Sequence, residues 1–175
     1  MTTPVRLSSW DVAYALNMAI ACVISYWVMT HALSHVIGRN DDLLGGMWAA
    51  VATVFVFRSA REESLSAGAA RLIATLVSIA LCLAYLWFLP FTVAGFGALI
   101  AMGTLIMMLF DRRGDIVTTG ITTAVVMVAA AISPADAWHQ PALRLADTMV
   151  GIAVGISCKW IGSYVFFRVA GESVR

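Results

Sequence analysis

The stretch RLIATLVSIALCLAYLWFLPFTVAGFGALIAMGTLIMMLF, residues 71–110, contains a single charged residue, Arg71. It consists of two apolar runs, each close to the length of about 20 residues that a helix needs to cross the hydrocarbon core of a bilayer. Only Leu89-Pro90-Phe91 separates the runs, and this connection is short and uncharged. The two runs are therefore predicted to form a tight helical hairpin in a membrane.

The rest of the 175-residue chain has the same character. Apolar side chains make up 61% of the residues and charged side chains 12%, with a mean hydropathy of +0.89. Soluble domains are about half apolar and about a quarter charged. Six spans use about 120 residues, so residues 1–175 are expected to form one transmembrane domain without a nucleotide-binding fold. The predicted spans are 10–32, 43–57, 69–89, 91–110, 116–133 and 144–167.

All six spans are expected to be helices. Backbone in lipid must satisfy its own hydrogen bonds, and the sequence lacks the alternating pattern of a membrane β-barrel. The fold class predicted is thus all-α, a polytopic membrane protein. The span 10–32 resembles a secretory signal after Arg6, but it exceeds the usual apolar length of about 7–15 residues for such signals. It is expected to be retained as the first helix.

The distribution of arginines predicts the orientation. With the N-terminus in the cytoplasm, eight arginines fall on the inner side, against Arg39 and Arg144 outside. Basic residues favour cytoplasmic loops, so we expect both termini in the cytoplasm and the protein in the inner (plasma) membrane. The inner arginines are Arg6, Arg58, Arg61, Arg71, Arg112, Arg113, Arg168 and Arg175.

A repeat links the third and sixth spans. The nonapeptides 71–79 and 144–152 match at five of nine positions, beginning with Arg71 and Arg144. Three spans separate the copies, so they enter the membrane from opposite sides, as in an inverted-topology repeat of spans 1–3 and 4–6. Such a repeat implies a site near the midplane between the halves.

Ionisable residues within spans are the first functional candidates, because charge in a membrane is costly. Asp147 lies three residues after Arg144, close enough for an ion pair on one helix face. That pair either shields both charges or acts as a gate or anion contact. Lys159 either extends toward the inner surface or lines a pore. Asp11 suits a helix N-terminus, with a proton-carrying role as the alternative.

Polar and small residues elsewhere have two interpretations each. The arginines of the inner loops are topology signals or an anion-attracting vestibule. The small residues of the second and sixth spans, including Gly151 and Gly155, indicate close helix packing. Threonines in the fifth span pack or face a water-filled path. The vestibule candidates are Arg58, Arg61, Arg112 and Arg113; the threonines are Thr118, Thr119, Thr122 and Thr123.

The sequence gives little support for catalysis or cofactors. Cys22, Cys82 and Cys158 all fall inside spans, where a thiol behaves as a small apolar group, so neither a disulfide nor a metal site is expected. No nucleophile constellation or metalloprotease motif is supported by its context. We therefore expect no enzyme activity, no cofactor and no nucleic-acid partner.

Gly45-Gly46-Met47-Trp48-Ala49-Ala50-Val51-Ala52-Thr53-Val54, a short arginine-bearing loop, and Ala70-Arg71-Leu72-Ile73-Ala74-Thr75 resemble the fusaric acid resistance protein-like (FUSC) family. A second Arg-hydrophobic-x-x-Thr helix follows at Arg144–Thr148. The resemblance covers about residues 43–160 and implies export of aromatic and other organic acids. Larger relatives carry a cytosolic domain and often two six-helix blocks, whereas this chain has one block.

These observations lead to one main hypothesis and two alternatives. The main hypothesis is an inner-membrane exporter of small organic anions, with a path between spans two, three, five and six. The alternatives are a passive anion channel formed by a homodimer, and a non-transporting membrane subunit of a larger complex. A homo-oligomer, a dimer above all, is expected, and an export partner protein is a further expectation. The predicted substrate-binding residues are Arg71, Arg144, Lys159, Thr75, Thr148 and Trp48, and the gating or proton-coupling residues are Asp147 and Asp11.

Overall fold

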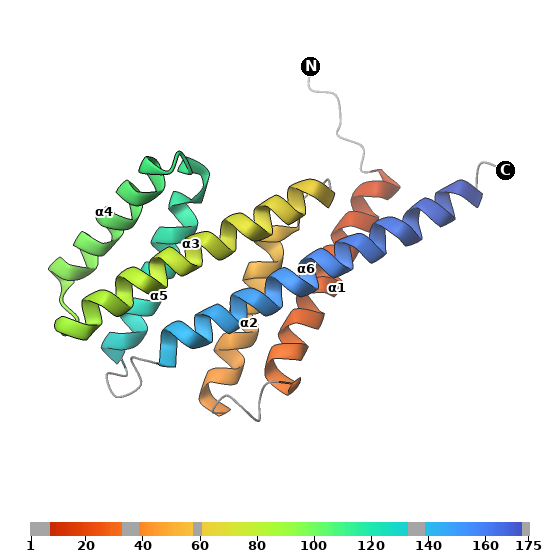
Figure 1. The fold of residues 1–175 in the computed structure, drawn as a ribbon. Coiled ribbons are helices and arrows are strands. Elements are labelled where there is room, and N and C mark those ends of the chain that lie inside the picture. Colours follow the sequence, from red (N-terminus) through yellow and green to blue (C-terminus); the bar gives the residue numbers. More distant parts are fainter. Residues whose placement is uncertain (1–7, 33–38, 58–60, 133–138, 173–175) are drawn as a thin grey trace, which may run out of the picture.

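The computed structural model describes residues 8–32, 39–57, 61–132 and 139–172, and these form a bundle of helices (Figure 1). Within these ranges there is no β-strand. The helices are α1 (Ser9–Trp27), α2 (Arg39–Val56), α3 (Arg61–Phe88), α4 (Val93–Leu109), α5 (Ile116–Ile132) and α6 (His139–Glu172), with a π-helical turn η1 (Val28–Ala32) after α1 and a 3₁₀ turn η2 (Arg113–Asp115) before α5.

Successive helices run in opposite directions (Figure 1). The start of α1, the end of α2 and turn η2 lie on the side of the bundle where α6 ends, and the α3–α4 connection lies on the other side. Within the described ranges, four segments are long and apolar enough to cross a membrane, and two apolar helices, 43–56 and 93–109, are shorter. The membrane-protein class and the helical fold are confirmed, while the count of six spans stays a prediction. The spanning segments are Trp10–His31, Glu62–Phe88, Arg113–Ile132 and Gln140–Val165.

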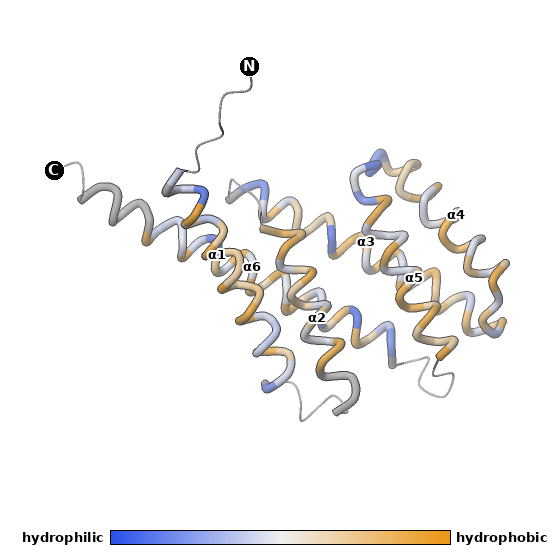
Figure 2. The backbone as a smooth tube through the Cα atoms, turned by 180° about the vertical axis from the view of Figure 1, so that it is seen from behind, coloured by the Kyte–Doolittle hydropathy of each residue, from blue (hydrophilic) through white to orange (hydrophobic). Residues whose placement is uncertain are grey.

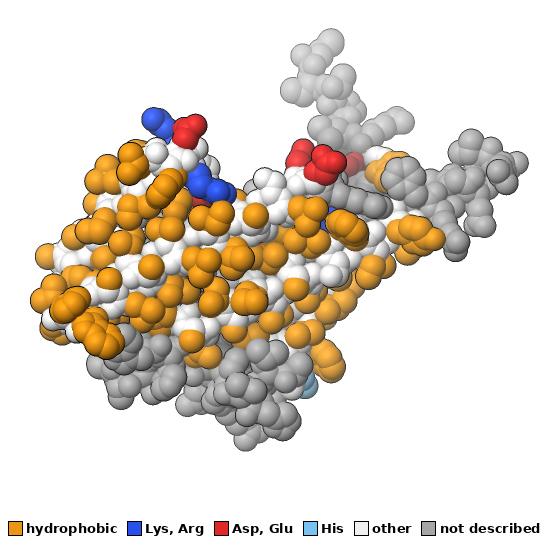
Figure 3. All heavy atoms as spheres, viewed as in Figure 1, with side chains coloured by type: hydrophobic (Ala, Val, Ile, Leu, Met, Phe, Trp, Pro, Cys, Tyr) orange, Lys and Arg blue, Asp and Glu red, His pale blue; other side chains and the backbone are white. Residues whose placement is uncertain are grey.

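The surface of the bundle suits lipid. Hydrophobic residues predominate in the middle of the helices and hydrophilic stretches lie mainly near their ends, while α3 and α6 also carry hydrophilic positions within their length (Figure 2). On the face shown in Figure 3, apolar side chains cover the middle and charged side chains lie along the upper edge. Large apolar side chains such as Trp27, Leu105 and Ile161 are more than half exposed. In water this surface would be costly to hydrate, whereas in a bilayer it meets acyl chains.

Local signals explain where several helices begin. The Ser8 hydroxyl caps α1 by accepting from the Trp10 N–H, and the Asp11 carboxylate accepts from the Ser8 N–H. This reciprocal arrangement satisfies amide groups that a helix start leaves open. Asp11 therefore lies at a helix N-terminus, as the first interpretation had it. At the hairpin, Thr92 caps α4 by accepting from the Gly95 N–H, and the Tyr85 hydroxyl lies 2.8 Å from that of Thr92.

Some boundaries differ from the sequence-based expectation. The third span was predicted from residue 69, but α3 begins at Arg61, and α6 extends beyond both ends of 144–167. A hydropathy pattern marks where the chain is apolar, whereas a helix continues beyond the hydrocarbon core as long as its backbone bonds are made. Glu62 and Glu63 in the first turn favour the early start of α3, because acidic residues interact well with a helix N-terminus.

The helices pack in matching pairs. α2 packs most extensively against α6, and α5 packs against α3; α1 lies on α2 and α6, and α4 on α5 and α3. An inverted repeat would relate α1 to α4, α2 to α5 and α3 to α6. When each helix is replaced by its counterpart, every helix–helix contact named above becomes another contact that the bundle contains. An inverted repeat would produce such a pattern, with the α3–α6 contact at its centre, and the repeat itself stays a prediction.

Candidate functional site

The two arginines of the repeat lie against the same face of α2. The guanidinium carbon of Arg144 is 4.8 Å from the ring centroid of Trp48, and that of Arg71 is 4.4 Å from the ring centroid of Phe55. Trp48 and Phe55 are seven residues apart, two turns along one face of a helix. Cation–aromatic contacts of this kind are strongest where water is excluded. Arg71 and Arg144 are only 7% and 8% exposed.

Arg144 forms a buried ion pair with Asp147. The Nη1 atom of Arg144 lies 3.1 Å from Oδ2 of Asp147, and Asp147 is 1% exposed. Gly45 of α2 makes room for this carboxylate, since a Cβ atom at Gly45 would lie 3.0 Å from Oδ1 of Asp147. The predicted pair is present and inaccessible to bulk solvent. The small cavity beside it holds about 10 Å³, enough for about one water molecule. Its lining is Met29, Leu44, Gly45, Gln140, Leu143, Arg144 and Asp147.

Arg71 begins a line of buried polar groups on α3. Thr75, one turn further on the same face, is 1% exposed. Neither Nε of Arg71 nor Oγ1 of Thr75 has a hydrogen-bond partner among the described residues. Buried polar atoms in proteins are almost always hydrogen-bonded, to protein or to water. These two atoms are therefore open for a water molecule or a polar ligand.

Thr75 and Thr148 lie at the same level of the bundle. A Cβ atom at Gly68 of α3 would lie 3.0 Å from the Ile152 side chain and 3.2 Å from that of Ile156 on α6. The two helices run in opposite directions (Figure 1), so a move forward along α3 corresponds to a move backward along α6. Thr75 lies seven residues after Gly68, and a similar move back along α6 from Ile152 and Ile156 leads to Thr148. Arg71 and Arg144 each lie one turn before their threonine. They are thus separated by about 12 Å along the bundle, on either side of the threonines.

Hydroxyl groups join the matching helix pairs at equivalent positions. Ser78 of α3 donates to the Thr119 carbonyl of α5 (2.9 Å), and Thr53 of α2 donates to the Gly151 carbonyl of α6 (3.1 Å). Ser78 and Gly151 are the eighth residues of the two copies of the repeat. Thr53 also contacts the buried Ser25 hydroxyl of α1. The core between these helices is therefore polar and closely packed.

The threonines of α5 lie inside the bundle. Thr119 and Thr122 donate to backbone carbonyls one turn earlier, those of Asp115 and Thr118. Oγ1 of Thr123 is buried with no hydrogen-bond partner in the described part of the chain. Packing accounts for Thr119 and Thr122, and the buried Thr123 lies beside Cys82 of α3.

Lys159 lies apart from the two arginines. Its ammonium is 4.8 Å from the ring centroid of Tyr14 on α1 and 5.3 Å from that of Phe57, just after α2, and the side chain is 8% exposed. The Tyr14 hydroxyl donates to the Phe57 carbonyl at 3.0 Å. The sequence suggested either an extension toward the inner surface or a place in the path. The ammonium lies against these two aromatic rings on the α1 side of the bundle, and both alternatives stay predictions.

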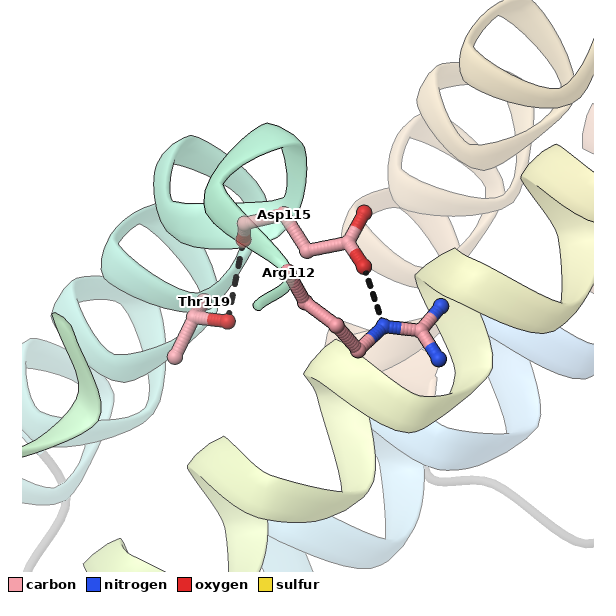
Figure 4. A network of polar contacts seen from close by, with 3 residues as sticks. All are labelled: Arg112, Asp115 and Thr119. Atoms are coloured by element: carbon pink, nitrogen blue, oxygen red, sulfur yellow. Dashed lines mark hydrogen bonds and ion pairs between the residues drawn. The ribbon is translucent and has the colours of Figure 1, made fainter. Parts of the chain in front are cut away.

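The loop arginines are described only in part. Arg112 forms an ion pair with Asp115, Nε to Oδ2 2.8 Å, next to the Thr119–Asp115 hydrogen bond (Figure 4). Arg113 is exposed. Arg58 lies outside the described residues, and of Arg61 only the backbone at the start of α3 is described. A four-arginine vestibule therefore stays a prediction.

Three participants could not be identified from the sequence alone. Phe55 lies seven residues after Trp48, a spacing that places both rings on one face of a helix. This spacing was the signal in the sequence that could have identified Phe55. Met29 is 1% exposed beside the Arg144–Asp147 pair and lies in the π turn η1, which no sequence pattern marks. Gly45 was assigned to packing, and it also makes room for a carboxylate. Among the described residues, no group of three His, Cys, Asp or Glu side chains could hold a metal ion.

Comparison with known proteins gives the family. A model of the fusaric acid resistance protein-like family matches residues 20–158, which include both copies of the repeat and all of α2 to α5. No curated protein and no solved structure matches the chain. The match covers well over half of the chain and extends the resemblance seen in its motifs. This chain therefore belongs to the fusaric acid resistance protein-like family of membrane transport proteins.

Proposed function

We propose that the protein is an inner-membrane transporter that exports small organic anions, aromatic carboxylic acids among them. The observation that carries the proposal is the pair of buried arginines at equivalent positions of α3 and α6, each against an aromatic ring of α2. Ionisable groups inside a membrane are costly and mark substrate or ion pathways. Family membership supports transport as the activity.

The charge of the buried residues favours an anion. Among the side chains that are described, the buried charged groups of α3 and α6 near the two threonines are two cations, Arg71 and Arg144, and one carboxylate, Asp147. The third buried cation, Lys159, lies apart from them on the α1 side. A guanidinium binds a carboxylate through two parallel hydrogen bonds. The substrate would meet Arg71 and Arg144 in turn, with the hydroxyls of Thr75 and Thr148 between them.

The rings beside the arginines favour an aromatic acid. Trp48 and Phe55 present their faces to the guanidinium groups. An acid with a ring would exchange part of these contacts for stacking on the same ring, while its carboxylate binds the arginine. An aliphatic acid of the same charge would gain only the second interaction. We therefore expect aromatic acids to be preferred over aliphatic acids of similar size.

The closed state of the site favours a carrier over a permanently open channel. A cavity with room for about one water does not admit an organic acid. The site must open, and two halves that pack alike offer two related arrangements between which a carrier alternates. Asp147 holds Arg144 in the closed state and would release it by taking up a proton or as the substrate arrives. Asp11, held at the start of α1, receives no role in this scheme.

The test is flux of radiolabelled benzoate into proteoliposomes containing only this chain, with and without an imposed pH gradient. Arg71→Gln and Arg144→Gln should each lower flux about tenfold or more, since a charge-assisted hydrogen bond is worth about 1.5–3 kcal/mol. Glu62→Gln, which removes an exposed charge from the same helix as Arg71, is the matched control and should leave flux unchanged.

Three outcomes would overturn parts of the proposal. Wild-type flux in both arginine variants would remove the arginines from the path. Ohmic benzoate current through the wild-type chain would favour the dimeric anion channel over the carrier. No flux for any acid of a broad panel would favour the second alternative, a non-transporting membrane subunit of a larger complex.

A further inference from the structure

A groove of about 890 Å³ runs along the perimeter of the bundle between α1 and α6. Its walls are largely apolar, with Leu16, Ile20 and Ile24 on α1 and Ile161 and Val165 on α6. The polar residues of its lining include one cation and one carboxylate, and they are Asp11, Asn17, Lys159 and Ser163. The volume is typical of ligand-binding pockets, which hold about 300–1,000 Å³. The groove is separate from the cavity beside Arg144 and Asp147, since the two share no lining residue.

The positive charge in the groove is held in a fixed position. The Lys159 ammonium lies over the ring of Tyr14, and that ring packs edge-on against Phe57 with centroids 5.2 Å apart. The Tyr14 hydroxyl is itself fixed by its hydrogen bond to the Phe57 carbonyl. A lysine held in this way loses little further side-chain entropy when an anion binds beside it.

The two helices are also fastened to each other at the groove. The Asn17 side-chain amide donates to the Cys158 carbonyl at 3.2 Å. Gly162 permits this contact, because a Cβ atom there would lie 2.0 Å from Nδ2 of Asn17. The hydrogen bond keeps α1 and α6 at a constant distance along this level. The groove is therefore part of the folded bundle and does not require an occupant to form.

The length of the groove corresponds to one leaflet of a bilayer. Trp10 lines its end near the start of α1, and an exposed tryptophan at a helix end is typical of the membrane–water interface. Tyr14 and Lys159 lie one turn deeper. From Tyr14 to Ile24 the helix rises about 15 Å, which is half of the hydrocarbon thickness of about 30 Å.

We propose that this groove binds one anionic phospholipid, with its phosphate at Lys159 and an acyl chain along Leu16, Ile20 and Ile24. In the predicted orientation the lipid belongs to the cytoplasmic leaflet. The Lys159 ammonium near that surface fits an anionic phosphate, and the apolar length beyond it fits an acyl chain. The exposed Asp11 lies at the end of the groove beside Trp10, where its carboxylate accepts from the Ser8 N–H. A small organic acid matches the charge and leaves the apolar walls uncovered. The inference does not depend on the proposed transport.

The test is native mass spectrometry of the purified full chain, titrated in mild detergent with phosphatidylglycerol or with phosphatidylcholine of the same acyl chains. The wild-type chain should bind phosphatidylglycerol about fivefold or more tightly than phosphatidylcholine, the preference that a lysine near an anionic headgroup supplies. Lys159→Gln should abolish the preference, and Lys159→Arg, which keeps the charge, should retain most of it.

A second variant tests the acyl part of the site. Ile20→Trp places a larger ring in the groove and should weaken binding of both lipids, with the thermal unfolding of the bundle as the check on folding. A preference unchanged by Lys159→Gln would overturn the proposal. Competition by millimolar inorganic phosphate alone would indicate an anion site without a lipid. A change of oligomeric state in Ile20→Trp with lipid binding intact would identify a second copy as the occupant.

Discussion

Replacing Asp147 by Asn should destabilise the folded chain by about 3–5 kcal/mol and stop transport. The substitution keeps the size of the side chain and removes the carboxylate that lies 3.1 Å from the Arg144 guanidinium. Removing one partner of a buried ion pair leaves the other charge without compensation in a medium that solvates it poorly. The stability is measured by reversible unfolding in mixed micelles and transport by benzoate flux.

The double variant Arg144→Gln/Asp147→Asn separates structure from function. With both charges removed, most of the lost stability should return, because the buried polar side chains are then neutral and can hydrogen-bond to each other. Flux should stay low, since the guanidinium that would bind the carboxylate is gone. Additive costs of the two single substitutions would mean that the pair is not coupled. Restored flux in the double variant would show that transport does not use Arg144.

The sequence identified the charged residues of this site more readily than the aromatic residues that contact them. Arg144 and Asp147 are three residues apart on one helix, so their contact follows from helix geometry alone. Arg71 was found because its segment repeats that of Arg144. Their aromatic partners lie on α2, and only the packing of α2 against α6 and α3 shows which rings face the arginines. Local periodicity identifies a face of a helix, while its neighbour depends on the whole bundle.

The limits of the fold prediction have the same origin. Hydropathy located the apolar centre of each helix and the tight turn between α3 and α4, because both are encoded within a short window of sequence. The early start of α3 at Arg61 and the π turn after Trp27 depend on local backbone bonding outside or at the edge of the apolar region. Neither leaves a hydropathy signal.

The aromatic partners of Lys159 could not be predicted from the sequence of α6 alone. From α6 alone, its options were to extend toward the inner surface or to line a path. The structure adds that the side chain lies against Tyr14 and Phe57, residues more than one hundred positions away in the sequence. Aromatic rings offer a buried ammonium a partner that is not a carboxylate, and no pattern within the sixth span predicts it.

The structure also shows which helix Gly151 and Gly155 of α6 face. Gly151 and Gly155 form a Gly-x-x-x-Gly motif, which was assigned to close helix packing. Both face α2 of the same chain: a Cβ atom at Gly151 would lie 2.4 Å from the Ala49 carbonyl oxygen, and one at Gly155 would lie 3.4 Å from the Thr53 side chain. The motif thus joins the most extensively packed pair of helices within one chain. A dimer stays a prediction that rests on the family resemblance.

Adding a single methyl group at Gly151 should therefore have a large effect. In Gly151→Ala the new Cβ would meet a backbone carbonyl at 2.4 Å and the Ala52 Cβ at 2.5 Å, distances that real Cβ atoms do not adopt. Neither neighbour can rotate away, so α6 must move from α2, and the Thr53 hydroxyl loses its geometry toward the Gly151 carbonyl. We expect a loss of about 3 kcal/mol or more, at the upper end of the cost of overpacking a core, measured as a lower free energy of unfolding.

The matched control lies one turn away in the same motif. In Gly155→Ala the new Cβ would lie 3.4 Å or more from its neighbours, an ordinary contact distance, so stability should change by less than about 1 kcal/mol. Gly97→Ala on α4, where nothing lies within 4 Å, should be equally mild. If the motif instead joined two chains, both alanine variants of α6 would shift the oligomeric state in mild detergent and leave the unfolding of the monomer unchanged. A large difference in stability between Gly151→Ala and Gly155→Ala, at an unchanged oligomeric state, is the result that the packing of α6 on α2 requires.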